Sequence, residues 1–138
     1  MRQMVSGTVL ADLRRRAGRT DVIASRVLRT WGESESGLAE RLGGRIAALD
    51  ESGNPTLAFL AAGIEGIKVR ITVKAAGAAE AAALLDAESD VLTELLGELV
   101  FSADDESMEE VVVRLLGESG ETVSIAETFT GGLMASRL

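Results

Sequence analysis

The sequence predicts an α+β fold whose sheet contains a strand at residues 67–75. Apolar residues alternate with polar ones along this segment, which is typical of a strand with one buried and one wet face. A second segment has its apolar residues at spacings of four, four and three, which is typical of a helix; these are Leu38, Leu42, Ile46 and Leu49. Hydrophobic residues make up 46% of the 138 residues, enough to form a core.

The first half of the chain predicts two helices and three strands. An amphipathic helix over 9–16 ends at Gly18, and residues 21–31 are rich in strand formers. Ser34 is placed to cap the helix that contains Leu38, and the Ser-Gly-Asn-Pro sequence at 52–55 predicts a turn. The segments 56–62 and 67–75 then form an antiparallel hairpin, because four residues containing glycine connect them.

The second half predicts further helices and two short strands. Residues 77–97 form one long helix or a broken pair, and residues 99–102 a short strand. Ser107 and Glu110 have the spacing of a capping box, so a helix begins there and ends at Gly117 or Gly120. The expected buried residues of the long helix are Ala79, Ala82, Ala83, Leu92, Leu95 and Leu96; those of the capped helix are Met108, Val111, Val112 and Leu115.

The last residues predict a strand over 122–126 and a glycine-led helix over 128–138. A strand followed by one short helix is half of a βαβ unit, which needs a second strand. We therefore expect this piece to pack against a partner, or to be the opening of an α/β domain in a longer protein.

Composition excludes several kinds of chemistry. The chain has no histidine and no cysteine, so it contains no imidazole base, no thiol nucleophile and no His or Cys metal site. We expect no metal site and no cofactor in this chain. No apolar stretch reaches the length of a membrane span and no signal peptide is evident, so we expect a cytoplasmic protein with no membrane partner.

Charge is divided along the chain. Residues 1–45 carry nine arginines against five acids, whereas residues 86–121 carry twelve acids against Arg114 alone. The net charge is −8, which disfavours nucleic acid as the main partner. We interpret the acidic segment as a solvated face, with a cation or a basic partner as the alternative.

Several motifs resemble the competence- and damage-inducible CinA family. They are Val27-Leu28-Arg29-Thr30-Trp31-Gly32, Glu35-Ser36, Leu38-Ala39-Glu40-Arg41-Leu42, Asn54-Pro55-Thr56-Leu57-Ala58, Val69-Arg70-Ile71-Thr72 and Ala126-Glu127-Thr128-Phe129-Thr130-Gly131-Gly132-Leu133. The resemblance implies three parts. Residues 1–18 would be the end of a molybdopterin-binding-like domain or a linker helix, and residues 19–104 would be a KH-like middle domain with helices on one face of a small mixed or antiparallel sheet. Residues 105–138 would be the start of a nicotinamide mononucleotide deamidase domain.

The resemblance also implies a function for a larger parent protein. That parent would hydrolyse nicotinamide mononucleotide to nicotinate mononucleotide and ammonia, and its N-terminal domain is associated with ADP-ribose pyrophosphatase activity. The present chain would be the scaffold between the missing N- and C-terminal domains, and would form a homodimer.

Within the glycine motif, Thr128 stands where the family has its candidate nucleophilic serine. Thr130, Gly131 and Gly132 match the family pattern and would bring backbone N–H groups toward the substrate. The Lys and Tyr that complete the family site have no counterpart up to Leu138, and the chain has no tyrosine. We therefore expect the chain alone to be inactive, with Thr128 or Thr130 serving as a helix cap, unless a partner chain completes the site.

Three further residues belong to the family-like motifs. Gly32 ends the first strand, and we hypothesise that Glu35 pairs with Arg70. The Gly-Ile-Glu-Gly sequence at 63–66 has the form of a KH-type backbone clamp, which keeps a nucleic-acid-binding module as an alternative function. We interpret it instead as a hairpin turn, because it lies between two strands and carries an acidic residue.

Overall fold

The computed structural model describes residues 9, 12, 13, 16, 18, 21–61 and 63–138. Its elements follow in the order β1 (Val22–Thr30), α3 (Glu35–Arg41), α4 (Gly43–Ser52), β2 (Thr56–Ala61), η2 (Gly63–Glu65), β3 (Ile67–Ala75), α5 (Ala78–Leu96), η3 (Gly97–Leu99), β4 (Val100–Ser102), α6 (Met108–Ser119) and α7 (Leu133–Arg137). Of the helix expected at 9–16, residues 10, 11, 14 and 15 lie outside the described ones.

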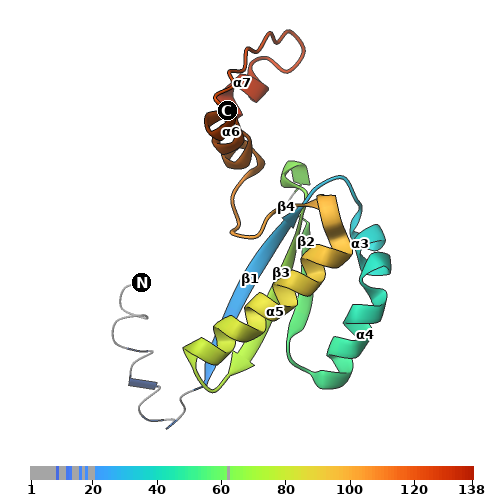
Figure 1. Cartoon of the computed structure of the whole chain (residues 1–138), viewed down its shortest axis with the longest axis vertical. Helices are drawn as coiled ribbons and strands as arrows, with labels where there is room; N and C mark the ends of the chain where they lie inside the picture. Colours follow the sequence, from blue (N-terminus) through green and yellow to red (C-terminus); the bar gives the residue numbers. More distant parts are fainter. Residues whose placement is uncertain (1–8, 10–11, 14–15, 17, 19–20, 62) are drawn as a thin grey trace.

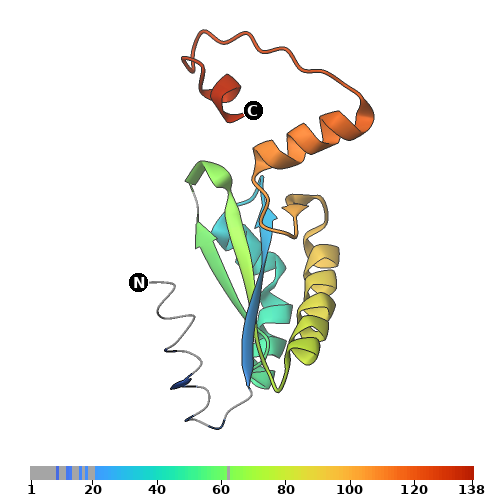
Figure 2. The same cartoon turned by 90° about the vertical axis from the view of Figure 1, so that its left-hand side faces the viewer.

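The sheet has four antiparallel strands in the order β2-β3-β1-β4, which confirms the α+β class. Helices α3, α4 and α5 lie on one face of it, and α6 and α7 lie beyond the end where β1 finishes (Figures 1 and 2). The alternation predicted for residues 67–75 is confirmed, because every second residue of β3 is buried.

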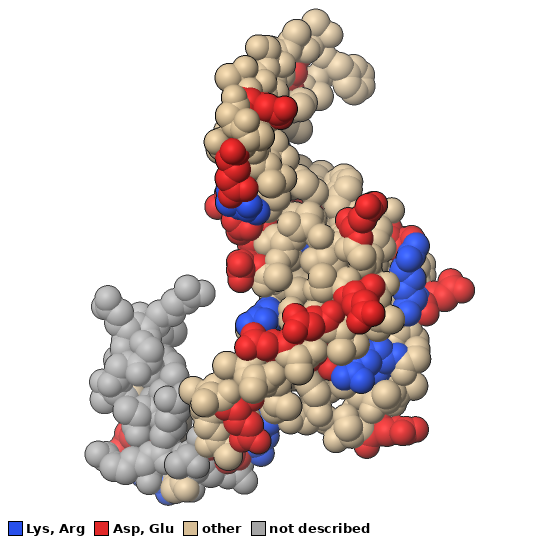
Figure 3. Space-filling view, in the orientation of Figure 1, with Lys and Arg blue, Asp and Glu red and all other residues tan. Residues whose placement is uncertain are grey.

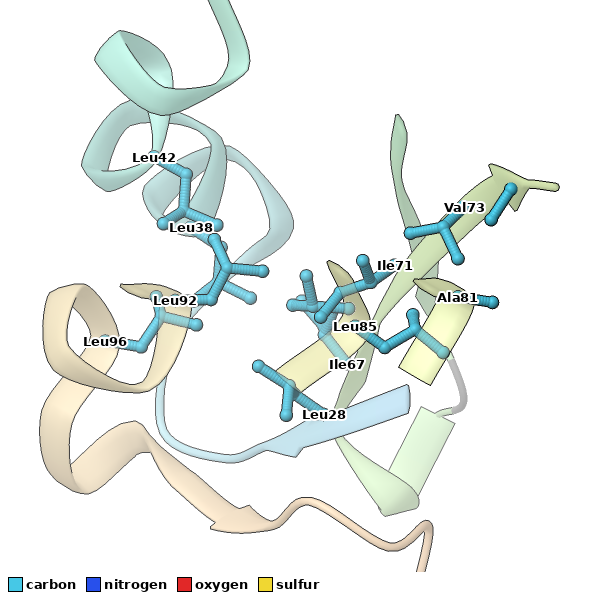
Figure 4. Packing of buried hydrophobic residues seen from close by; sticks show 12 residues of the cluster. Leu28, Leu38, Leu42, Ile67, Ile71, Val73, Ala81, Leu85, Leu92 and Leu96 are labelled. Carbon is cyan, nitrogen blue, oxygen red and sulfur yellow. The ribbon is translucent and has the colours of Figure 1, made fainter. Parts of the chain in front are cut away.

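The core lies between the sheet and the three helices. Leu38 and Leu42 pack against the end of α5 at Leu92 and Leu96, and the strands face the earlier turns of α5 (Figure 4). Most of these side chains are leucine, isoleucine and valine, as the shortage of aromatic residues requires. Burial of such side chains is worth about 1.5–3 kcal/mol each, so this cluster dominates the stability of the sheet domain.

The helix predicted to follow Ser34 forms as two helices. Ser34 caps α3 as expected, with its hydroxyl accepting from the N–H of Gly37. The helical run is interrupted at Leu42, which is followed by Gly43 and Gly44. Two adjacent glycines weaken helix propensity at this point. Leu38 and Leu42, four residues apart on one side of the run, are both fully buried.

The expected buried face of α5 was wrong at four of six positions. Ala79, Ala82, Ala83 and Leu95 are exposed, and only Leu92 and Leu96 are buried. The buried residues are Ala81, Leu85, Glu88, Ser89, Leu92 and Leu96. Alanine lies on every side of this helix, so composition did not distinguish its buried face from its exposed face. The buried face also includes a glutamate, Glu88.

Glu88 is buried on this face because Arg45 of α4 binds it with two hydrogen bonds. The Nε of Arg45 donates to Oε1 at 2.9 Å, and its second nitrogen donates to Oε2. Glu88 is 3% exposed and Arg45 is 33% exposed. The hydrogen bond to Glu88 raises the pKa of Arg45, so the guanidinium stays charged. This pair fixes α4 against α5.

The C-terminal segment departs from prediction. The capping box at Ser107 is confirmed, and α6 ends at Gly120, whose positive φ of 69° suits glycine. Val111 is buried as expected, but Leu115 is 51% exposed. Residues 122–126 form no strand, because no strand of the described residues pairs with them, and the final helix is shortened to α7.

We predict that Arg45→Met lowers the free energy of unfolding by about 3 kcal/mol, because it leaves the buried carboxylate of Glu88 without its partner. Arg41→Met is the matched control: Arg41 is half exposed and lies 3.8 Å from Glu33, so its loss should cost below about 1 kcal/mol. Urea unfolding measures both. Adding Glu88→Leu to Arg45→Met should recover part of the loss, and equal small effects of the two single variants would contradict the prediction.

Candidate functional site

The guanidinium of Arg29 connects three separate segments of the chain. Arg29 lies near the end of β1 and is only 4% exposed. One of its terminal nitrogens donates to Glu65 of η2 at 2.9 Å. The other donates to the backbone oxygen and to the carboxylate of Asp105, at 3.2 and 3.3 Å, in the segment between β4 and α6. The charged centre also lies 5.8 Å from the ring of Phe101.

Asp105 is held in an unusual backbone conformation. Its φ is +59°, and it is the one non-glycine residue with positive φ among the described residues. That conformation costs about 1 kcal/mol or more, so the surroundings must hold it in place. Arg29 holds it from one side and the ammonium of Lys68 from another, at 3.2 Å. The N–H groups of Asp104 and Glu106 both donate to the hydroxyl of Ser102, at 3.2 Å.

The Gly-x-x-Gly segment at 63–66 is a hairpin connection, as interpreted from the sequence. Strands β2 and β3 pair antiparallel on either side of it. Gly66 has a φ of +79°, and a Cβ there would lie 2.2 Å from the backbone oxygen of Thr30, so no side chain fits. Because Glu65 is bound to Arg29, the loop presents a neutralised carboxylate where a clamp for nucleic acid needs free cations.

The glycine motif at 126–132 forms a turn that ends in α7. Thr128 is exposed, and no other side chain among the described residues hydrogen-bonds to its hydroxyl. Thr130 donates to the carboxylate of Glu127. Gly131 and Gly132 have φ of +64° and +95°, with open space where a Cβ would lie. Glycine is therefore required at these two positions by the positive φ angles and not by the close approach of a neighbour.

The carboxylate of Glu127 occupies the N-terminal end of α7. Its two oxygens accept from the N–H groups of Met134 and Ala135, at 2.8 and 2.9 Å. The hydroxyl of Thr130, followed by the N–H of Ala135, lowers the pKa of Glu127. The hydroxyl of Thr130 and the N–H groups of Met134 and Ala135 thus surround a carboxylate of the chain itself.

The residues Gly32, Glu35 and Arg70 do not form one site. Gly32 follows β1 with φ of +93° next to Leu99. Glu35 begins α3 on the helical face of the sheet, whereas Arg70 is exposed on the opposite face of β3. The hypothesised Glu35–Arg70 pair is therefore wrong: the two residues lie on opposite sides of the sheet.

The acidic segment 86–121 does not gather into a metal site. Within the described ranges, no three histidine, cysteine, aspartate or glutamate side chains lie together as metal ligands. Acidic side chains instead follow the outer surface of α5 (Figure 3); Asp86, Asp90 and Glu94 are exposed at intervals of one helical turn, and Glu98 is exposed just beyond. The described part of the chain also has no helix with the length and apolar character needed to cross a membrane.

Sequence analysis missed the residues that the structure brings together. The guanidinium of Arg29 is bound by Glu65, which lies 36 residues later in the sequence, and by Asp105, which lies 76 residues later. The available signal was an arginine next to two buried residues at the end of a strand, a position where a charge needs a partner. Glu127 was part of the glycine motif, but nothing in the sequence assigned it the capping role.

We predict that the contacts of Glu127 survive mild acid. Because its pKa is lowered in the folded chain, its contribution to folding is complete above the unfolded pKa and is lost as the pH falls through the folded pKa. The amide NMR shifts of Met134 and Ala135 should titrate below the ordinary carboxyl range. Glu127→Gln should abolish that titration, and Glu121→Gln, a change at an exposed acid on the same segment, should not. Titration that persists in Glu127→Gln would contradict the assignment.

Comparison with known proteins identifies the sheet domain. Residues 25–102 match the family model described as the damage-inducible protein CinA KH domain. A CinA-like protein of Frankia casuarinae is 43% identical over all 138 residues, which cover 32% of its length. One of Prochlorococcus marinus is 42% identical over the same residues, which cover 31% of its length.

A putative competence-damage inducible protein of Clostridium kluyveri is 44% identical over 117 residues, which are 85% of this chain and 28% of that protein. The chain thus spans about a third of the length of the curated relatives it matches. Because the family model matches residues 25–102, more than half of the chain and all but the start of the sheet, the chain belongs to the CinA family.

Proposed function

We propose that this chain is a connecting and associating module that positions the other domains of a CinA-like protein. The observation that carries the proposal is the Arg29 network, because it binds the exit of the sheet domain at Asp105 to both β1 and the hairpin. The chain therefore leaves the sheet domain at Asp105 in a defined direction. The segment that follows, starting with α6, is therefore oriented by the sheet rather than loosely tethered.

The sheet domain has what a positioning module needs. Its core is continuous from α3 through the strands to α5, so it is rigid over the region that matches the family model. The relatives are about three times longer than this chain, so a module of this kind has other domains to hold. Association with a second copy is part of the same proposal.

For the larger protein we propose hydrolysis of the amide of a nicotinamide nucleotide, with residues 105–138 as the opening of the hydrolytic domain. Water would replace the amide nitrogen, which leaves as ammonia, and Thr128 would stand at the nucleophile position next to Thr130, Gly131 and Gly132. The motif at 126–132 supports this proposal. The reaction is a hydrolysis that needs no resident cofactor from this chain, and the cytoplasm is the proposed location.

This chemistry needs more than a hydroxyl at the nucleophile position. An attacking hydroxyl requires a base within hydrogen-bond reach, and within the described residues no side chain hydrogen-bonds to the hydroxyl of Thr128. The N–H groups that start α7 are bound to Glu127. A catalytic arrangement would require this carboxylate to give up those donors.

We predict that Arg29→Lys loosens the segment around Asp105, between β4 and α6. Lysine keeps the charge but cannot bind Glu65 and Asp105 together, so the free energy of unfolding should fall by about 2 kcal/mol. The amides of Asp104 and Glu106 should exchange with solvent at least about tenfold faster, as measured by hydrogen exchange with NMR detection. Arg26→Lys is the matched control, because Arg26 lies on the same strand and pairs with the exposed Asp86 at 2.7 Å. Equal exchange at Asp104 and Glu106 in both variants would contradict the connecting role.

We also predict that the purified 138-residue chain releases no ammonia from nicotinamide mononucleotide above the uncatalysed rate, and that Thr128→Ala is indistinguishable from it. A coupled assay for ammonia measures both. Ammonia release that Thr128→Ala abolishes would show instead that copies of this chain complete the site among themselves.

A further inference from the structure

The two edges of the sheet differ in how they are protected. At one edge, β4 has only three residues and an irregular register against β1, which is a common way to prevent unwanted strand pairing. At the other edge, β2 has six residues with no charge, no proline and a regular register along β3. An edge strand of this composition is suited to pairing with another strand.

The direction of the backbone groups in β2 follows from the side chain of Asn54. This side chain donates to the backbone oxygen of Lys74 and accepts from its N–H, both at 2.9 Å, so the backbone of Lys74 faces the β2 side. Backbone direction alternates along a strand, so Thr72, Arg70 and Lys68 also face β2. The hydroxyl of Thr56 donating to the oxygen of Thr72, at 3.5 Å, agrees with this.

The partners of these residues in β2 are Thr56, Ala58 and Leu60, whose N–H and C=O groups therefore point inward to β3. Leu57, Phe59 and Ala61 point theirs outward, away from the sheet. Among the described residues, no backbone or side-chain group hydrogen-bonds to the outward set. The edge thus presents three N–H and three C=O groups in one line.

We propose that this edge pairs with the same edge of a second copy, joining two sheets across a two-fold axis at Phe59. This inference rests on the association role proposed above and gives it a surface. In that register each outward residue meets an outward residue: Phe59 meets the partner's Phe59, and Leu57 meets the partner's Ala61. Each such pair exchanges two hydrogen bonds, about six in all.

The chemistry of the strand fits a copy of itself. Across a two-fold axis the residue on the axis meets its own copy, and every like charge on the strand lies near its counterpart, which is unfavourable; β2 has no charged residue. Phe59 and Leu57 are half buried on the core face, so pairing buries their remaining surface and places two aromatic rings side by side. Leu60, 38% exposed on the open face, is covered in the same step.

The first test follows the unmodified chain over a range of concentrations. Sedimentation velocity should show monomer converting to dimer as concentration rises, because one strand pair buries less area than a permanent interface. In hydrogen exchange with NMR detection, the amides of Leu57, Phe59 and Ala61 should become protected with concentration. Those of Ala58 and Leu60 should be protected at every concentration.

The second test uses Ala61→Pro. This change removes an outward N–H without touching the bonds to β3, and proline is tolerated at such a position of an edge strand. It should raise the dimer dissociation constant at least about tenfold. Ala78→Pro is the matched control, because Ala78 is the first residue of α5, where proline also fits, and it lies on another element. Unchanged circular dichroism shows that both variants fold.

Two results overturn the inference, and they differ in what they say about association. A dimer whose outward β2 amides stay unprotected, or that survives Ala61→Pro unchanged, places the contact elsewhere while leaving association intact. A chain that stays monomeric at every concentration, with these amides open to exchange, removes both association and this edge as its surface. Neither result bears on the Arg29 junction, which the exchange of Asp104 and Glu106 tests separately.

Discussion

The buried guanidinium of Arg29 is the constraint on which the end of this domain depends. A charge this far from solvent is unfavourable unless it is bound, and two carboxylates and one backbone oxygen bind its two terminal nitrogens. Its Nε is also buried and has no hydrogen-bond partner among the described residues. Those acceptors come from the hairpin and from the segment after β4, so neither can move without exposing an unpaired charge. The positive φ of Asp105, a conformation that needs such support, and the tight approach of Gly66 to Thr30 lie in the same place.

The elements with strong local patterns were predictable from sequence. The alternation of 67–75, the cap at Ser34 and the capping box at Ser107 each depend on neighbouring residues, and each is confirmed. The buried face of α5 was not predictable in the same way, because alanine lies all around it and Glu88 is buried only through Arg45 on another helix. The strand predicted at 122–126 has the right composition, but a strand forms only with a partner.

The candidate site shows the same limit at the level of side chains. The hairpin interpretation of 63–66 needed only turn chemistry, whereas the role of Glu65 depends on an arginine 36 residues away. The glycines of the 126–132 motif have the positive φ that such a motif suggests, yet the group bound at the start of α7 is Glu127. Charged residues that satisfy one another across long sequence distances leave little trace in a single sequence.

The position of Trp31 gives the molecule a built-in optical probe. It is the chain's one tryptophan, and the chain has no tyrosine, so its near-ultraviolet emission comes from a single indole. The backbone N–H of Trp31 donates to the backbone oxygen of Leu99, a ring carbon would lie 3.1 Å from a Cβ at Gly66, and the side chain is half exposed. The indole thus lies against the hairpin while the backbone of the same residue is bound to the approach to β4, so its fluorescence reports on the junction where the sheet domain ends.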